Sequence, residues 1–415
     1  MFSLITKINT TNKMQLIKTA ITTVILATGV SAFGAGFQVQ EQGASNMGTA
    51  MAGAVSNANN DASAAFLNPA AVKYIDMEAG KTMVTAAISA VIPTLGLSTD
   101  GKEYDCAVNA FVPNIFTVHK FTDDIFASLS VTAPFGLECE YDSNWIGRQM
   151  AIQSVLLTTD INPSLTYKVN DWFAFGGGIS AQYAYCKLTN GVPGYPIGDA
   201  ALSGNGWGVG GNVGFTVDYM ESGRFSFAWR SAVQQDLEGT LRVFGASAGS
   251  ISASVEMPQS FTFGVYQRLP GYFDNFAVMA DYSYTAWSSF DRLTITGATS
   301  QTTIENWKDT SRVSGGLHYY PEQFKDLTLR IGFAYDESPV DCAEYRTARI
   351  PCSDRLWYTA GFGYQIAENI KIDMSYAYIM TIGNSDSVPS QFGGTQEGHY
   401  YGHIHVLSAQ VSFVF

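Results

Sequence analysis

Charge, basic tracts and long apolar runs are all scarce in this sequence. Charged residues make up 14% of the 415 residues, well below the roughly 25% that is usual in soluble domains. The formal net charge is −13 and lysine and arginine form no cluster, which argues against a nucleic-acid partner. After residue 34 no segment approaches the roughly 20 consecutive apolar residues that a transmembrane helix needs. A membrane-spanning form of this chain would therefore have to cross with strands.

The first residues have the organisation of a secretory signal peptide. Lysines form a positive region, residues 20–33 form an apolar core, and Ala32 to Gly34 make a small-residue cleavage site. We therefore expect a signal peptide over residues 1–34. An uncleaved anchor is the alternative, although the run is short for a span, and Met14 is an alternative start of the chain.

After Met77, apolar and polar residues alternate with a period of two, which indicates β-strands. In residues 370–382 one face is isoleucine, methionine and tyrosine, whereas the other holds Lys371 and Asp373. The same alternation recurs at 173–185. These apolar faces are rich in aromatic residues and too numerous for one soluble core. They favour a barrel that is apolar outside and polar inside.

Short and long connections alternate between these segments. Short ones include residues 121–124 ("FTDD") and 367–369 ("AEN"). The longer ones fall near residues 96–110, 139–155, 191–205, 237–250, 288–306, 338–354 and 385–402. Because short periplasmic turns and long outer loops are typical of outer-membrane barrels, the sequence predicts an all-β membrane protein. We expect an antiparallel transmembrane β-barrel of about 14 strands over residues 77–415, with both termini in the periplasm.

One strand is interrupted at "SVTAPFGLECEY", residues 130–141. Pro134 removes a ladder donor and Gly136 removes a side chain that could pack. Such residues mark a bulge, an edge or a place where another group approaches the backbone. In our count the interruption lies on the third strand.

Residues 35–76 are rich in alanine, glycine, serine and asparagine and have no strand period. Taken alone, they are either a disordered tail or a plug. The stretch "GAGFQVQEQGASNMGTAMAGAVSNANNDASAAFLNPAAV" resembles the start of mature FadL-family outer-membrane transporters for fatty acids and other hydrophobic compounds. The similarity continues through "VPN" (112–114), "APFGLECEYDSNWIGRQ" (133–149), "INPSLTYKVND" and "DESPVDCAEYRTARIPCSDRLWYTAGFGY". It therefore runs over nearly the whole mature chain.

The resemblance implies a monomer with an N-terminal hatch, residues 35–76, inside the barrel lumen. In that family a hydrophobic substrate is held between outer loops, enters an apolar pocket and contacts the hatch. It leaves sideways into the membrane at a kink in the third strand. The residues that the resemblance singles out are Pro134, Phe135 and Gly136 at the kink and on the substrate path, Phe37, Asn68, Pro69 and Ala70 in the hatch, and Trp145, Gly147 and Arg148 in an outer loop.

The implied function is passive uptake of long-chain fatty acids or similar hydrophobic compounds across the bacterial outer membrane. The implied partners are fatty acids or hydrocarbons, outer-membrane lipid and lipopolysaccharide, and the barrel assembly machinery, which reads a terminal aromatic residue such as Phe415. One feature departs from the family: the loop near 191–205 is short, whereas in the best-known fatty-acid transporters it is long and forms half of the capture groove. The chain length of the substrate, and whether it is aliphatic or aromatic, stay open.

Patterns of enzyme and cofactor sites are weak. Residues 245–249 ("GASAG") fit a hydrolase nucleophile pattern but lie in an expected loop, without the strand–turn–helix context. Residues 206–211 ("GWGVGG") continue into a strand, so a phosphate-binding helix is missing. His403 and His405 share a strand face and could share a metal, but polar residues at a rim are more often simply solvated. We expect no enzymatic activity, metal or cofactor; a lipase-like outer-membrane enzyme and a surface adhesin barrel without transport are the alternatives.

Cysteines and inward-facing charged residues also have expected partners. Five cysteines map to the outer end of the barrel, and Cys342 and Cys352 share one loop. In an oxidising compartment we expect a disulfide between those two, with the remaining connectivity open. Unpaired charge in a closed lumen is costly, so inward basic residues should meet carboxylates. The basic residues are Arg224, Arg230, Arg312, Arg330 and Lys371, and the expected carboxylates are Asp281, Asp336 and Asp373.

Overall fold

The computed structural model describes residues 35–195, 197–383, 385–387 and 397–415; the expected signal peptide lies outside them. The helices are α2 (Ala44–Met47), α3 (Ala64–Leu67), η1 (Pro69–Tyr74), η2 (Gly271–Phe273) and η3 (Trp287–Ser289). The strands are β1 (Thr82–Thr99), β2 (Lys102–Asp105), β3 (Ala110–Lys120), β4 (Ile125–Thr132), β5 (Gly136–Glu140), β6 (Gln153–Lys168), β7 (Phe173–Gly191), β8 (Asp199–Tyr219), β9 (Gly223–Arg230), β10 (Val233–Val243), β11 (Ala246–Met257), β12 (Ser260–Arg268), β13 (Phe276–Thr285), β14 (Arg292–Gly297), β15 (Gln301–Ile304), β16 (Thr310–Tyr319), β17 (Leu327–Asp336), β18 (Asp354–Ala367), β19 (Ile370–Ile382), β20 (Asp386–Ser387) and β21 (Gly398–Val414).

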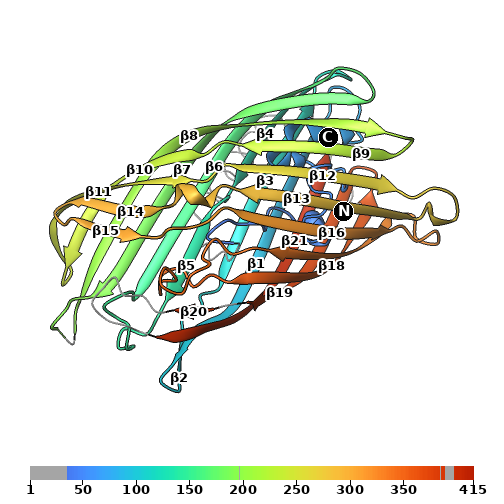
Figure 1. Ribbon diagram of the computed structural model, residues 1–415. Helices are drawn as coiled ribbons and strands as arrows, with labels where there is room; N and C mark the ends of the chain where they lie inside the picture. The colour runs from blue at the N-terminus through green and yellow to red at the C-terminus, as the bar shows by residue number, and fades with distance from the viewer. Residues whose placement is uncertain (1–34, 196, 384, 388–396) are drawn as a thin grey trace, which may run out of the picture.

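The strands form one closed antiparallel barrel (Figure 1). Closure occurs where β1 pairs with β21 over residues 83–98, while the other edge of β1 pairs with β3. Five wall strands are interrupted and consist of two labelled pieces: β4 and β5, β9 and β10, β11 and β12, β13 and β14, and β15 and β16. β2 and β20 extend the outer loops, so the wall has 14 strands, which confirms the sequence-based expectation.

The two faces of the wall differ in chemistry. Along β19 the side chains of Met374 and Tyr376 are 48% and 40% exposed on the outside, whereas Asp373 and Ser375 are buried inside. Because the side-chain period of a strand is two, the same alternation follows from the sequence pattern. Apolar residues therefore face outward and polar residues face the lumen, as a barrel in lipid requires.

The connections divide the barrel into two ends. Short turns such as residues 121–124 lie at the same end as Phe415, which pairs with Thr82, and this is the periplasmic end. One expected long loop, residues 237–250, is absent: β10 and β11 pair directly across a turn at Phe244 and Gly245. Both turn residues have positive φ, 51° and 77°, as two-residue hairpins require.

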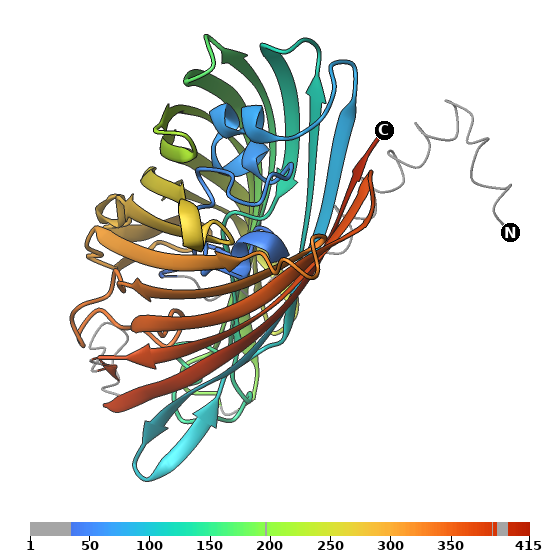
Figure 2. The same ribbon diagram turned by 90° about the vertical axis from the view of Figure 1, so that its right-hand side faces the viewer.

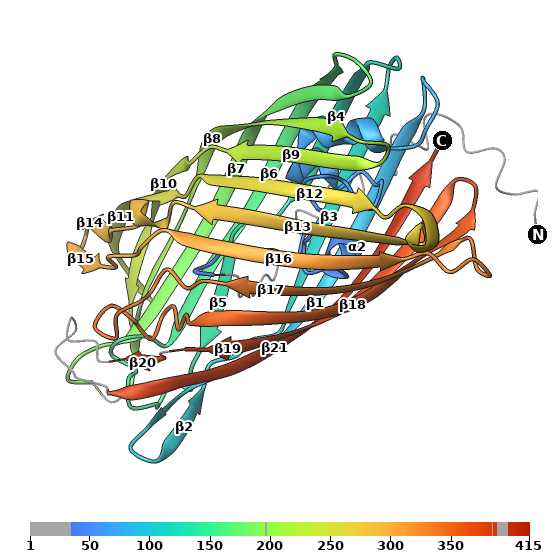
Figure 3. The ribbon, with the colours of Figure 1, turned by 45° about the vertical axis from the view of Figure 1, so that its right-hand side comes forward.

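Residues 35–77, called here the lumenal segment, lie inside the barrel (Figures 2 and 3). α2 contacts β18, β19 and β21, whereas η1 contacts β6, β7 and β8 across the lumen. Almost all of these residues are buried, so the segment fills the barrel interior over this depth. Among the described residues, no helix combines the length and the apolar character needed to cross a membrane.

Small residues let the lumenal segment approach the wall closely. A Cβ atom added at Gly332 of β17 would lie 2.1 Å from the backbone of Thr49, and one at Gly214 of β8 would lie 2.1 Å from Asn68 Oδ1. Neither contact is tolerable, so both wall positions require glycine. The alanine- and serine-rich composition of residues 35–76 has the same cause, since larger side chains would hold the segment away from the wall.

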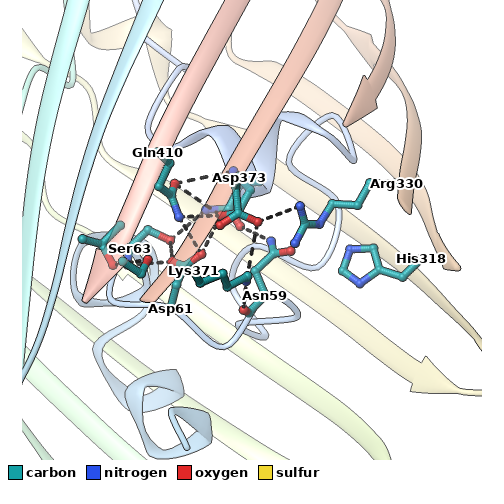
Figure 4. A network of polar contacts seen from close by, with 12 residues as sticks. Asn59, Asp61, Ser63, His318, Arg330, Lys371, Asp373 and Gln410 are labelled. Atoms are coloured by element: carbon teal, nitrogen blue, oxygen red, sulfur yellow. Dashed lines mark hydrogen bonds and ion pairs between the residues drawn. The ribbon is translucent and has the colours of Figure 1, made fainter. Parts of the chain in front are cut away.

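A buried carboxylate, Asp61, fixes the middle of the lumenal segment to β21 (Figure 4). Asp61 accepts hydrogen bonds from the hydroxyl groups of Ser45 (2.6 Å) and Ser63 and from Gln410 Nε2 (3.0 Å). These bonds satisfy the carboxylate within the closed lumen, where desolvation would otherwise make its charge costly. Asp61 therefore ties two parts of the segment to each other and to the wall.

A second polar contact beside Asp61 involves wall charges (Figure 4). Lys371 Nζ donates to the carbonyl oxygen of Asn59 (2.9 Å), and Arg330 Nη1 lies 2.8 Å from Asp373 Oδ1. Lys371 Nζ is 3.5 Å from the same carboxylate oxygen. The expected pairing of Arg330 and Lys371 with Asp373 is therefore confirmed.

The other inward arginines find different partners from those expected. Arg230 pairs with Asp160 (3.2 Å), whereas Arg312 donates to the carbonyl oxygen of Ala50. Arg224 donates to the carbonyl oxygens of residues 56 and 57. Asp281 accepts the backbone N–H of Gly53 at 2.8 Å and interacts with Arg312 through its charge, without an ion pair among the described residues. Sequence patterns of the wall did not reveal these bonds, because the partners are backbone groups of an irregular segment.

The turn at Asn68–Pro69 docks the segment against β6 and β8. Asn68 is extended, as the following proline requires, and its Oδ1 accepts the N–H of Ala70 (3.1 Å). Its Nδ2 donates to the carbonyl oxygens of Val55 (2.8 Å) and Phe215 (3.3 Å). The Thr166 hydroxyl donates to the Pro69 carbonyl (2.6 Å).

Asn68→Ala should loosen the lumenal segment while the barrel still assembles. The substitution leaves buried backbone groups without partners, which costs about 1–3 kcal/mol per group. We expect faster protease cleavage within residues 35–77 of the folded, heat-modifiable barrel, and lower substrate uptake. Asn144→Ala, in an exposed outer loop, is the control. Protease resistance and uptake equal to wild type would refute this role.

Candidate substrate-binding site

The third wall strand is broken between β4 and β5. β4 pairs with both β3 and β6, whereas β5 pairs with β6 only. Within the described residues, residues 110–114 of β3 consequently pair with β1 on one side and with no strand on the other. A bridge between Ala107 and Cys139 closes the interruption at its outer end. The wall therefore has a bounded stretch without a hydrogen-bonded ladder between β3 and β5, called here the wall interruption.

The lumenal segment satisfies the backbone groups at the break. The N–H of Val39 donates to the Pro134 carbonyl (2.9 Å), and the N–H of Gly136 donates to the Phe37 carbonyl (2.8 Å). The N–H of Phe135 donates to the Thr158 hydroxyl (2.9 Å). Freed groups within a barrel wall must find such partners, because lipid offers none. The N-terminal segment and the lumenal hydroxyl of Thr158 therefore satisfy the backbone groups that the break frees.

The side chain of Phe37 is the centre of an aromatic cluster above this pairing. The centroid of its ring lies 4.6 Å from the ring centroid of Trp287 and 5.5 Å from those of Phe290 and Trp307. The ring centroid of Phe135 is 6.0 Å away. These separations are typical of favourable aromatic contacts. The cluster joins the lumenal segment to the segments that follow β13 and β15, so Phe37 links the break to the outer part of the barrel.

An apolar cavity of about 70 Å³ lies directly outward of this cluster. Phe37 and Leu137 line it on the side of the break. A second apolar cavity, of about 50 Å³, shares five lining residues with the first and continues between β8, β10, β11 and β14. The shared residues are Cys186, Leu188, Leu237, Val255 and Leu293. These two adjoining cavities are called here the apolar path, and it abuts the broken strand through Leu137 of β5.

Two charged side chains, Arg349 and Glu305, stand in the lining of this apolar path. Arg349 Nη1 donates to the Ser154 hydroxyl at 3.2 Å, and burial lowers the pKa of Arg349 to about 10. Glu305 is only 5% exposed, and burial raises its pKa to about 7 despite the nearby charge of Arg349. The remaining lining is predominantly apolar, so the site suits an amphiphile with one polar end.

The apolar path is narrower than an occupied ligand pocket, which is usually about 300–1,000 Å³. Substrate entry therefore requires side chains such as Leu188 and Leu237 to move apart. A larger cavity, of about 340 Å³, lies beneath the lumenal segment at the periplasmic end. Arg330, Lys371 and Glu368 line it, so it suits water and polar groups rather than a hydrocarbon chain.

Only some of the residues singled out from the sequence line the apolar path. Phe37 does, and Phe135 and Gly136 adjoin it through the break, whereas Asn68, Pro69 and Ala70 dock the lumenal segment to the wall. Trp145 stacks on Tyr141 at 4.0 Å, and a Cβ atom at Gly147 would overlap the Trp145 ring. Arg148 donates to three backbone carbonyl oxygens, of residues 143, 195 and 198. Within the described part of the chain, these three therefore hold two outer loops together rather than line the cavity.

The expected Cys342–Cys352 disulfide is absent, and all five cysteines are free. Cys342 is exposed, whereas Cys352 is buried and its sulfur accepts the N–H of Gly36 at 3.3 Å. Arg355 also donates to that sulfur (3.4 Å). The position of both cysteines in one loop did not predict a disulfide correctly, because Cys352 turns into the lumen and contacts the start of the lumenal segment.

Sequence reasoning missed Arg349 and Glu305. Arg349 lies within the quoted stretch "YRTARIPC", which also holds Arg346, and Glu305 lies in "TIENW"; each of the two charges stands next to an apolar residue. That local contrast was the available signal. It could not identify the site, because the two residues come from separate loops that only the closed barrel brings together.

The rim histidines His403 and His405 contact neighbouring tyrosines. The Tyr376 hydroxyl is 2.7 Å from His405 Nδ1, and the His403 ring lies 5.8 Å from the Tyr378 ring. Among the residues that the structure describes, no group of three or more potential ligands could hold a metal ion.

Comparisons with known proteins agree with this architecture. The family model for outer membrane protein transport proteins (OMPP1/FadL/TodX) matches residues 24–415. A long-chain fatty acid transport protein of Escherichia coli O6:H1 is 28% identical over 417 residues, covering 88% of this chain and 92% of the relative. Outer membrane protein P1 of Haemophilus influenzae is 27% identical, with 86% and 88% coverage.

Solved structures share the fold. A Pseudomonas aeruginosa FadL homologue superposes with a TM-score of 0.82 at 23% identity, covering 91% of this chain and 99% of that one. The Pseudomonas putida toluene transporter TodX has a TM-score of 0.67 at 17% identity, with 90% and 97% coverage. Together with the apolar outer surface of the barrel, these matches place the protein in the outer membrane. The chain belongs to the OMPP1/FadL/TodX family of outer membrane transport proteins.

Proposed function

We propose that this protein takes up long-chain fatty acids by passive diffusion along the apolar path and releases them sideways into the membrane at the wall interruption. Its family consists of outer-membrane transporters of long-chain fatty acids and hydrophobic aromatic compounds. One observation carries the proposal: a single apolar path is lined by Arg349 and is flanked by Phe37 and Leu137 at the broken strand. The hatch of this mechanism is residues 35–76, which make up all but the last residue of the lumenal segment.

Arg349 is the proposed partner of the substrate carboxylate. A guanidinium group can bind a carboxylate with two parallel hydrogen bonds, and its partial desolvation strengthens the attraction. The alkyl chain then occupies the apolar lining, where each buried CH₂ contributes about 0.8 kcal/mol. An aromatic hydrocarbon is the second candidate substrate, favoured by the aromatic cluster around Phe37, but it gains nothing from Arg349.

The exit at the wall interruption follows from the local packing. The pairing of Phe37–Val39 with Pro134–Gly136 satisfies the broken strand from inside, so β5 needs no ladder with β3. An apolar molecule at Phe37 is therefore separated from lipid by side chains only and not by a hydrogen-bonded strand. The alternative exit, downward through the hatch, crosses the polar contacts of Asp61 and the charged cavity beneath them.

The remaining partners are proposed on the same basis. The barrel closes within one chain through β1 and β21, which supports a monomer in contact with outer-membrane lipid and lipopolysaccharide. The terminal Phe415 supports recognition by the barrel assembly machinery. We propose no catalytic step: the outer-loop motif at 245–249 is a strand hairpin and not a nucleophile turn, and the apolar path argues against a sealed adhesin.

Arg349→Met should reduce oleate uptake about 10- to 100-fold, since a hydrogen bond to a charged group contributes about 1.5–3 kcal/mol. Toluene uptake should remain at the wild-type rate, because the methionine preserves the apolar lining. The measurement is uptake of both radiolabelled compounds by cells that lack their own transporter. Arg242→Met, an exposed arginine on β10, is the matched control.

The two substrates decide between the candidate functions. Loss of both activities would mean that Arg349 maintains the loop rather than binds a carboxylate. Wild-type oleate uptake by the variant would contradict the proposed site, and uptake of toluene alone by the wild type would make the protein a hydrocarbon importer.

Restoring the third strand should stop release while leaving capture intact. The double variant Pro134→Thr/Gly136→Val supplies the missing N–H donor and side chain, whereas deletion of Gly136 shortens the interruption; in either variant β5 should pair with β3. We expect oleate binding to persist and oleate uptake to fall to the background of cells without the protein. Pro93→Thr, at a proline in the continuous pairing of β1 with β21, is the control. Uptake at the wild-type rate would show that substrate leaves by another route, most directly through the hatch.

A further inference from the structure

Glu305 has no role in the transport steps described so far, yet it lines the same apolar cavity as Arg349. It follows β15, and its side chain is only 5% exposed. Within the described part of the chain, its buried Oε2 atom accepts no hydrogen bond of good geometry, although the Trp307 indole lies close enough to favour the ionised form. A buried acceptor without a well-formed hydrogen bond is costly. The buried Glu305 carboxylate is therefore better explained by binding of a ligand or a proton than by a role in packing.

Glu305 and Arg349 are close enough to influence each other's charge. Arg349 favours the ionised form of Glu305, and Glu305 favours the charged form of Arg349. The two residues nevertheless form no ion pair within 4.0 Å among the described residues. The guanidinium thus keeps room for a second carboxylate, which would then lie beside Glu305.

Two carboxylates in one desolvated site do not both stay ionised. Repulsion between like charges raises the pKa of at least one of them, and a proton is taken up. A substrate carboxylate bound at Arg349 would place Glu305 in that situation. A neutral ligand in the same cavity would not.

We propose that Glu305 is a proton-uptake site of the apolar cavity, so that an anionic amphiphile binds together with one proton, whereas a neutral amphiphile binds without one. This inference rests on the proposed function, and it adds a regulation of the same site. Its consequence is selective capture of anions in a mildly acidic medium and easier release where the pH is higher.

The sign of the pH dependence follows from linkage. Burial holds the pKa of Glu305 near 7 in the empty cavity, and a bound anion raises it further. Below about pH 7 the residue is already protonated, so affinity for the anion is constant. Above that pH each anion must bring a proton, so affinity falls about 10-fold per pH unit until the pKa of the complex is reached.

Few other groups can contribute to this dependence. The ionisable side chains among the cavity lining are Arg349, from the loop between β17 and β18, and the Cys186 thiol of β7. The Trp307 indole is the remaining polar neighbour that acts on Glu305. Arg349 stays charged between pH 5.5 and 8.5 because its pKa is about 10. A thiol that ionised would also disfavour anions at high pH, and the variant below distinguishes it from Glu305.

The experiment uses two amphiphiles of equal chain length. Dodecanesulfonate remains ionised at every pH used, so its own titration cannot produce the effect, and dodecanol is neutral. Their dissociation constants would be measured by tryptophan fluorescence, with the full mature protein in lipid nanodiscs, between pH 5.5 and 8.5. For the wild type we expect sulfonate affinity to be constant below about pH 7 and to fall about 10-fold per unit above it, with no change for dodecanol.

Glu305→Gln removes the titrating group while keeping the side-chain shape. We expect this variant to bind sulfonate with the same affinity at every pH, as tightly as the wild type does at pH 5.5. A pH-independent wild type, or a slope that persists in Glu305→Gln, would overturn the inference while leaving the transport proposal intact. Absence of binding of both amphiphiles at every pH would overturn both.

Direct proton counting tests the same point without a variant. When saturating sulfonate is added to the wild-type protein in weakly buffered solution at pH 8, about one proton per protein should be taken up. Dodecanol should cause no uptake. Equal proton uptake with the two amphiphiles would contradict a charge-coupled site at Glu305.

Discussion

The backbone pairing between Phe37–Val39 and Pro134–Gly136 is the interaction on which the rest of the structure depends. A barrel wall in lipid can tolerate a broken strand only where protein satisfies the freed groups. Here the start of the lumenal segment supplies those partners. The same residues that complete the break place the Phe37 ring at the end of the apolar path. One contact therefore stabilises the wall and positions Phe37 at the apolar cavity, and in the proposed mechanism it also sets where a ligand reaches the membrane.

That pairing requires the lumenal segment to stay fixed, and a polar framework beneath it does this. Asp61 joins residues of the segment to Gln410, and Lys371 holds the carbonyl oxygen of Asn59. Glycine at position 332 lets the chain lie against the wall without a gap. Polar contacts at the periplasmic side and apolar contacts at the outer side divide the lumen. In the proposed mechanism, this division favours sideways exit of a hydrocarbon chain over passage through the segment.

The fold was largely predictable from the sequence, because a period of two is a property of each strand alone. The interruption at Pro134 was predictable for the same reason, since proline and glycine act locally. Arg349 and Glu305 were not, because their meeting depends on how two irregular loops fold over the barrel. Cys352 was misassigned for a related reason: it is buried against Gly36 and Arg355, whereas Cys342 is exposed. Backbone acceptors of the lumenal segment, such as the Ala50 carbonyl that binds Arg312, cannot be predicted from a pattern of residue types.

The route of the substrate is the central claim, and a crystal structure with a brominated long-chain fatty acid tests it most directly. Anomalous scattering locates bromine atoms placed at successive positions of the alkyl chain. Lateral release predicts bromine sites along the apolar path, beyond Phe37 and within the wall interruption between β3 and β5. Bromine sites below the lumenal segment, towards the polar cavity lined by Arg330 and Lys371, would contradict it.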